Sequence, residues 1–356
     1  MVMQMQSDPT PTNGLAPALN PLGLHRVYGV LFEIIKGGKE TSIHFEAALS
    51  CDQKLADYYY IYQLNRGPLY INNSMPEMLI DQLNASCGQV IYPLQVITGP
   101  MGDFKGVNNK KEILQRWIDV KPELERYYKG ALPMSVIAEM DKALNDNSRL
   151  LNSILSDQFI AVYFSDAYEL SRRWGAGETR RGIPVLPFTR AQDYRLDYQT
   201  DFSPTDNGTF RVQFSGTYVD DRSAEDLHKK RPVAVADALS GTATPVTGAA
   251  NLNYDFYSAD GTIASVTGSY HLRLMDELHE VRLQIYHLKE KDKASNDNSQ
   301  NVEKDGQNTE GGRLHDVGRQ LKDTGVTNLR QGAESRLMET ETVQNSKKGF
   351  FSFLNF

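Results

Sequence analysis

The chain has 356 residues, a net charge of −7 and 40% hydrophobic residues, and its mean hydropathy of −0.48 is slightly polar for a fully compact protein. This acidic balance argues against general nucleic-acid binding, because a phosphate backbone attracts a basic surface. No apolar run approaches the roughly 20 residues of a transmembrane helix, and residues 1–20 lack the basic and apolar segments of a secretory signal. We therefore expect a cytoplasmic protein without a transmembrane segment.

Strand patterns dominate the first third of the chain once a polar leader has ended. Residues 1–22 are rich in Gln, Pro, Thr and Asn, a composition typical of disorder. Aromatic and β-branched residues then predict strands at 25–36, 41–50, 57–64, 89–98 and 103–107. Gly37-Gly38-Lys39-Glu40 predicts a hairpin between the first two, and Pro93 indicates an edge strand because proline donates no ladder hydrogen bond. A short helix is expected at 75–85.

The hydrophobic period changes from two residues to nearly four between 109 and 159. Asn109 is followed three residues later by Glu112, a spacing that predicts a capped helix start. Pro122 is expected to begin a second helix. The segment therefore predicts three or four short amphipathic helices inserted between strands.

Strict alternation returns in the second half of the chain. Tyr194, Leu196 and Tyr198 alternate with polar residues within 194–202, and the same pattern fills 210–218. Because successive side chains of a strand point to opposite faces, these segments predict an antiparallel hairpin with one buried and one solvated face. Further elements are expected as strands at 159–164, 183–187, 252–258, 263–272 and 281–286, a short helix at 222–230 and a loop at 241–251.

These patterns predict an α+β fold with a large, strongly curved antiparallel sheet. The helical insertion at 109–159 is expected to pack on the concave face of that sheet. Strands before and after the insertion have to pair with each other, which favours one domain over 23–290. Residues 291–346 have the composition of a disordered or weakly helical tail, and 347–356 form an aromatic tip.

The aromatic tip is the main candidate for a binding element. Its apolar side chains are Phe350, Phe351, Phe353, Leu354 and Phe356. Burying two phenylalanines stabilises a contact by about 3–6 kcal/mol, so the tip is expected to dock on a partner, on its own domain, or on a membrane surface with the help of Lys347 and Lys348. The first functional hypothesis is a non-catalytic binding or assembly protein, an adaptor whose tip docks on a protein partner.

The second functional hypothesis is a carrier of an apolar small molecule or lipid. A sheet with a helical layer can enclose a cavity, although this is an analogy at the level of architecture. The expected lining is Tyr58, Tyr60, Tyr62, Trp117 and Met140. For the tyrosines, ordinary cross-strand packing is the alternative interpretation.

A glycine-rich segment at 172–182 carries four arginines, Arg172, Arg173, Arg180 and Arg181. Guanidinium groups beside free backbone amides suit a phosphate or a carboxylate. The segment has neither dinucleotide nor P-loop spacing. The alternatives are a loop in solvent or one that pairs with the acidic body.

No motif points to catalysis or to a metal. His44 and Glu46 share a strand face, which suits a general base, but no nucleophile motif accompanies them. No Cys or His spacing is typical of a metal site, and Cys51 and Cys87 are expected to be reduced, partly buried thiols. We therefore expect no cofactor and no enzymatic activity.

Overall fold

The computed structural model describes residues 18–289, except 56–57, 174, 187, 189–190, 204, 206, 230, 232 and 236–245. The described residues form one open antiparallel sheet of 12 strands. Its strands are β1 (Leu24–Lys36), β2 (Lys39–Leu55), β3 (Tyr59–Arg66), β4 (Tyr70–Ile71), β5 (Leu94–Thr98), β6 (Phe104–Val107), β7 (Gly175–Ile183), β8 (Gln192–Asp201), β9 (Thr209–Tyr218), β10 (Val246–Tyr257), β11 (Ile263–Leu274) and β12 (Glu277–His287).

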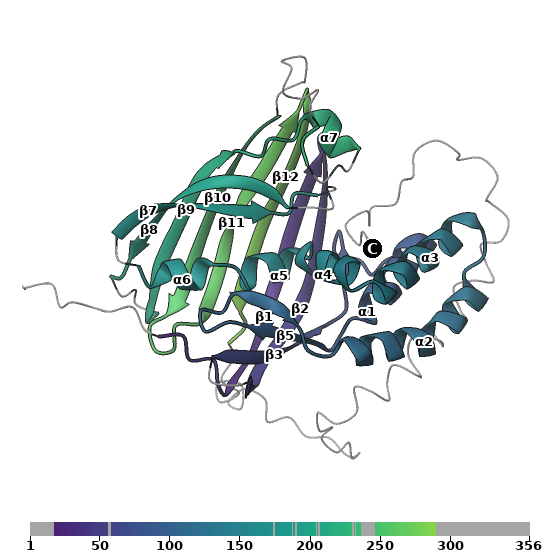
Figure 1. The fold of residues 1–356 in the computed structure, drawn as a ribbon, viewed down its shortest axis with the longest axis horizontal. Helices are drawn as coiled ribbons and strands as arrows, with labels where there is room; N and C mark the ends of the chain where they lie inside the picture. The colour runs from purple at the N-terminus through teal and green to yellow at the C-terminus, as the bar shows by residue number, and fades with distance from the viewer. Residues whose placement is uncertain are drawn as a thin grey trace, which may run out of the picture. The chain divides into compact units, whose positions relative to one another are not determined.

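Two runs of consecutive strands make up the sheet and meet near its middle. The strand order is β6-β5-β3-β2-β1-β12-β11-β10-β9-β8-β7, and β4 pairs with β2. Tyr28 of β1 lies opposite Ala47 of β2 on one side and His287 of β12 on the other. The first and last strands of the described chain are therefore neighbours (Figure 1).

Helices cover one face of the sheet and extend beside it. They are α1 (Leu79–Gln89), α2 (Lys110–Tyr127), α3 (Ala131–Asn145), α4 (Asn147–Leu155), α5 (Gln158–Tyr163), α6 (Ala167–Ser171) and α7 (Ala224–His228). In Figure 1, α4, α5 and α6 follow one another across the sheet. Within the described residues, no helix is long and apolar enough to cross a bilayer.

Buried aromatic rings join this helical layer to the sheet. Tyr163 of α5 meets Tyr28 of β1 edge-on with ring centroids 5.3 Å apart, and it stacks on Phe159 at 5.2 Å. Tyr168 of α6 contacts Phe256 of β10 at 5.5 Å. All five rings are buried. Aromatic pairs of this kind contribute about 0.5–1.5 kcal/mol beyond the burial of their surface.

Two tyrosine hydroxyls inside this layer bridge different elements. The Tyr28 hydroxyl donates to the Ile263 carbonyl at 2.7 Å, which links β1 to the start of β11. The Tyr254 hydroxyl of β10 donates to the Val162 carbonyl of α5 at 3.2 Å. A buried hydroxyl without a partner costs about 1–3 kcal/mol, so these bonds allow polar rings in the core.

The alternation that predicted the sheet is confirmed. Tyr194, Leu196 and Tyr198 of β8 are buried, whereas the residues between them are exposed. Tyr198 lies opposite Phe214 in the antiparallel ladder with β9. The predicted hairpin around Gly37-Gly38 is also present. The strands predicted at 252–258 and 263–272 pair as β10 and β11. The α+β class, the large antiparallel sheet and the helices on one face are therefore as predicted.

Several predicted elements in the helical region are wrong. Residues 159–163, predicted as strand, lie in helix α5, and Phe164 is its C-cap. The Asp157 side chain caps the start of this helix. Asn109 occupies the predicted N-cap position of α2, but its side chain makes no capping hydrogen bond: it accepts from the Gln95 amide at 2.9 Å and donates to the Pro93 carbonyl. Helix α2 also runs through Pro122 without a break. The helical region thus extends beyond the predicted 109–159.

Two strand predictions at the sheet edges are wrong as well. Pro93 precedes β5, which lies between β3 and β6 and so is not an edge strand. The segment 172–182, expected as a loop, is mostly the edge strand β7, because its backbone pairs with β8.

Two other predicted boundaries also differ from the structure. Strand β10 begins at Val246, within the predicted loop 241–251. Leu19, within the predicted leader, is buried.

Candidate functional site

A cleft lies where β1 and β2 face α1 and the turn between α4 and α5. It has a volume of about 70 Å³ and is partly open to solvent. Its apolar lining consists of Phe32, Ile34, Ile43, Phe45, Leu69, Ala85, Gly88, Ile91, Tyr92, Ile154, Ile160 and Leu186. Its polar lining consists of Arg66, Ser153, Ser156, Asp157 and Gln158. An apolar concave surface with a few polar groups is the usual form of a ligand site.

The sheet wall of the cleft follows directly from strand alternation. Phe32 and Ile34 are two residues apart on β1, and Ile43 and Phe45 are two residues apart on β2, so each pair lies on one face. Phe32 lies opposite Ile43 in the ladder, and the Phe32 and Phe45 ring centroids are 6.2 Å apart. Four apolar side chains thus form a continuous patch.

The helical wall is fixed by hydrogen bonds around a tight turn. Helix α4 ends at Leu155 and α5 begins at Gln158. The Asp157 carboxylate accepts a hydrogen bond from the Ile160 amide at 3.0 Å, which caps α5. The Gln158 side-chain amide donates to the Pro184 carbonyl at 2.9 Å. The wall is therefore preorganised rather than loose.

Arg66 places a positive charge inside this apolar cleft. Its guanidinium lies 4.7 Å from the Tyr92 ring centroid and 5.9 Å from that of Phe45. Its Nε is buried and has no hydrogen-bond partner in the described part of the chain. Burial raises the pKa of the nearby Asp157, whereas the charge of Arg66 lowers it. A buried donor of this kind suits an anionic ligand group.

The three tyrosines predicted to line a cavity lie in different environments. Tyr62 is buried and meets Phe164 edge-on at 5.3 Å. Tyr60 is half-buried and packs at the margin of the core. Tyr58 precedes β3 and is 67% exposed. The three side chains therefore do not share one environment.

Trp117 and Met140 lie within the helices instead of facing the sheet tyrosines. The Trp117 indole on α2 donates to Asp141 of α3 at 2.8 Å. Met140 of α3 is fully buried. Neither they nor the three predicted tyrosines line the cleft described above.

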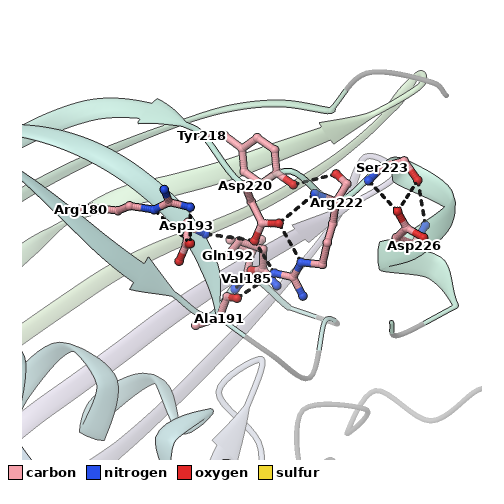
Figure 2. Close-up of polar contacts among 10 residues, drawn as sticks. All are labelled: Arg180, Val185, Ala191, Gln192, Asp193, Tyr218, Asp220, Arg222, Ser223 and Asp226. Carbon is pink, nitrogen blue, oxygen red and sulfur yellow. Dashed lines mark hydrogen bonds and ion pairs between the residues drawn. The ribbon is translucent and has the colours of Figure 1, made fainter. Parts of the chain in front are cut away.

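The predicted anion-binding arginines are directed to different partners. Arg180 and Arg181 are adjacent on β7 and so point to opposite faces. Arg180 pairs with Asp193 at 2.7 Å, as Figure 2 shows. Arg181 is buried, pairs with Asp166 and lies 4.4 Å from the Phe214 ring centroid. Both guanidinium groups therefore have internal partners.

The other two arginines of this set lie just before β7. Arg173 pairs with Glu169 on the preceding turn, with both side chains about half exposed. Arg172 is exposed and contacts the Met101 sulfur at 3.3 Å. With Arg180 and Arg181 on opposite faces, the four arginines do not converge on one anion.

Figure 2 also shows a buried ion pair just after the end of β9. Arg222 pairs with Asp220 at 2.5 Å and donates to the Ala191 carbonyl at 2.8 Å. Burial raises the pKa of Asp220, but the hydrogen bonds from Arg222 outweigh it and the net pKa is lowered. The Tyr218 hydroxyl donates to the Arg222 carbonyl at 3.1 Å. These groups satisfy one another and hold the turn after β9.

The remaining candidate residues show no reactive arrangement. His44 stacks on Tyr70 with ring centroids 4.9 Å apart. Cys51 and Cys87 are free and buried, and burial raises the pKa of each thiol to about 12. Across the described ranges, no three His, Cys, Asp or Glu side chains gather in a way that could hold a metal ion.

Sequence reasoning did not single out the polar groups of the cleft. Asp157 lies two residues before the apolar run that begins at Phe159, and an N-cap signal at that position could have identified α5. No local pattern marks Arg66. The aromatic tip, residues 347–356, and the tail 291–346 lie outside the described residues.

Comparison with known proteins gives little similarity. No family model matches the chain, and no curated protein matches it. One solved structure that matches, "Lipid-protein interactions in lipovitellin", has 9% sequence identity to this chain and a TM-score of 0.40. The match covers 74% of this chain and 25% of that chain, so the chain spans about a quarter of that protein's length.

Proposed function

We propose that the protein is a non-catalytic binding protein whose cleft holds the apolar end of a small ligand that also carries an anionic group. The observation that supports this most directly is the buried Nε of Arg66 within an apolar wall, which has no hydrogen-bond partner among the residues that the structure describes. A buried donor gains a charge-assisted hydrogen bond when an anion reaches it, typically about 1.5–3 kcal/mol. Apolar contacts with the strand residues add to this binding energy.

The size of the cleft limits what can enter it. Its 70 Å³ is about half of the roughly 150 Å³ apolar cavity that accepts benzene. The cleft therefore takes part of a ring or a short alkyl end, and the rest of the ligand extends through the open side. This supports a site for one apolar group rather than a store for a whole lipid.

A second candidate function is docking to a protein partner through the aromatic tip. It is supported by the composition of 350–356, in which five of seven residues are apolar and none is charged. A short segment of this kind suits a groove or a strand edge on a partner.

The ligand proposal is tested with 1-anilinonaphthalene-8-sulfonate, an apolar dye that carries a sulfonate. We expect its fluorescence to rise on the full chain and the rise to disappear in Ala85→Trp, which fills the cleft from α1. The matched control is Ala138→Trp, since Ala138 is exposed on α3. Arg66→Met should weaken dye binding about tenfold, in line with the loss of a charge-assisted bond, and should affect the neutral dye Nile red less.

Equal dye binding by Ala85→Trp and Ala138→Trp would place the dye elsewhere and refute the proposal. Equal weakening of both dyes by Arg66→Met would show that the arginine acts through packing and not as an anion partner. Near-UV circular dichroism of each variant checks that the fold is retained.

A further inference from the structure

We propose that the cleft is the docking site of the chain's own aromatic segment, 350–356, which thereby competes with the ligand. This inference rests on the proposed function of the cleft and adds its regulation. The occupant is a segment of this chain outside the described residues, and the same surface serves both binding events.

The chemistry of the segment matches the cleft. The cleft accepts part of a ring or a short alkyl end, and the segment offers four phenylalanines and one leucine. The sheet wall is itself aromatic, with Phe32 and Phe45 facing the opening. An incoming ring also reaches the Arg66 guanidinium, and a ring over a guanidinium contributes about 0.5–2 kcal/mol.

The chain connectivity allows the segment to reach the cleft. Strand β12 ends at His287, directly opposite Tyr28 on β1. The cleft begins at Phe32, four residues further along β1, a distance of about 13 Å at 3.3 Å per residue. Residues 290–349 number 60, and a flexible chain of that length has an end-to-end distance of about 40–45 Å. A connection of this length is long enough to reach the cleft, and short enough to keep the effective concentration of the segment at the cleft high.

Charge adds a weak preference for the same arrangement. The residues after Leu288 carry eleven basic and eleven acidic side chains, so the net charge of −7 belongs to the rest of the chain. Lys347 and Lys348 directly precede the aromatic segment. A pair of lysines at this point is attracted to an acidic body.

The test uses the full chain and a fluorescein-labelled peptide with the sequence of residues 347–356. In the tip variant, Phe350, Phe351, Phe353 and Phe356 are all changed to Ser. We expect the peptide to bind the tip variant, and this binding to be lost when Ala85→Trp is added but kept when Ala138→Trp is added. The wild-type chain should bind the peptide at least tenfold more weakly, because a tethered segment has an effective concentration of about 1 mM.

The matched control changes four leucines of the same tail to Ser, at positions 314, 321, 329 and 337. This leucine variant should bind the peptide as weakly as the wild type does, since its tip is intact. The anilinonaphthalene dye should bind the tip variant about tenfold more tightly than either, since the competing segment is gone.

The outcomes separate the two proposals. Dye binding that depends on Ala85, with no difference between wild type and tip variant and no peptide binding, overturns the inference and leaves the ligand site intact. Peptide binding that depends on Ala85, without dye binding, refutes the ligand site alone. Dimers of the wild type that the tip variant loses, seen by light scattering, would place the segment on a second copy and overturn docking within one chain.

Discussion

The close approach of β9 to β8 at Gly216 can be tested by adding a single methyl group. A Cβ built on Gly216 would lie 1.9 Å from the Arg195 carbonyl oxygen and 2.8 Å from the Leu196 Cα, all of it backbone. Real Cβ contacts are at least about 3.0 Å, so β8 would have to retreat by about 1.1 Å in Gly216→Ala. Leu196 pairs with Gly216 in the ladder, so that shift weakens the hydrogen bonds around it.

The expected cost follows from overpacking. Forced backbone displacement costs about 1–3 kcal/mol, and the weakened ladder puts Gly216→Ala at the upper end, about 2–3 kcal/mol. For a domain of this size that lowers the thermal midpoint by roughly 5–10 °C. The matched control is Gly106→Ala on β6, where a Cβ meets nothing within 4 Å. That variant should stay within about 2 °C of the wild type.

The assay is thermal unfolding followed by far-UV circular dichroism, with both variants at equal protein concentration. If Gly216→Ala melts within 1 °C of Gly106→Ala, the register and spacing of β8 and β9 given above are not those of the protein in solution.

Two further predictions concern buried titratable groups. Burial lowers the pKa of His279, so on acidification the unfolded chain binds a proton at this imidazole at a higher pH than the folded chain does. The thermal midpoint of the wild type should therefore fall between pH 7.5 and 5.5 by more than that of His279→Phe. Parallel pH profiles of the two proteins would contradict this. Burial raises the pKa of the Cys51 and Cys87 thiols to about 12. Ellman's reagent at pH 8 should therefore modify both thiols within minutes in urea and neither in the folded protein. Rapid labelling of the native chain would show that at least one thiol is accessible and would contradict this prediction.

Elements with a strong period could be predicted from the sequence alone. In β8, Tyr194 and Leu196 alternate with charged residues, and one buried sheet face imposes that pattern. The strand prediction for 159–164 is wrong because a short apolar run has the same composition in a buried helix and a buried strand. Strand β7 was missed because its glycines and arginines have little strand propensity, and pairing with β8 overrides that preference.

The cleft could not be predicted because its walls come from distant parts of the chain. Ile34 of the sheet and Leu186 face the same opening although 152 positions separate them. Each is an ordinary apolar residue in its own segment. Arg66 likewise gains its environment only when β3, which it ends, lies beside Tyr92 and Phe45. Such a site is a property of the tertiary fold and leaves no local motif.

The pairing of β1 with β12 has a consequence for how the protein is made. β1 is the first strand of the sheet to be synthesised and β12 is the last. β1 therefore lacks one of its two neighbouring strands until almost all of residues 24–287 have been translated. Until residue 287 has left the ribosome, β1 presents an open row of amides and carbonyls next to the apolar Val30 and Phe32. A nascent chain of this kind needs shielding during translation, and a premature stop anywhere before β12 leaves a product prone to aggregate through that exposed edge.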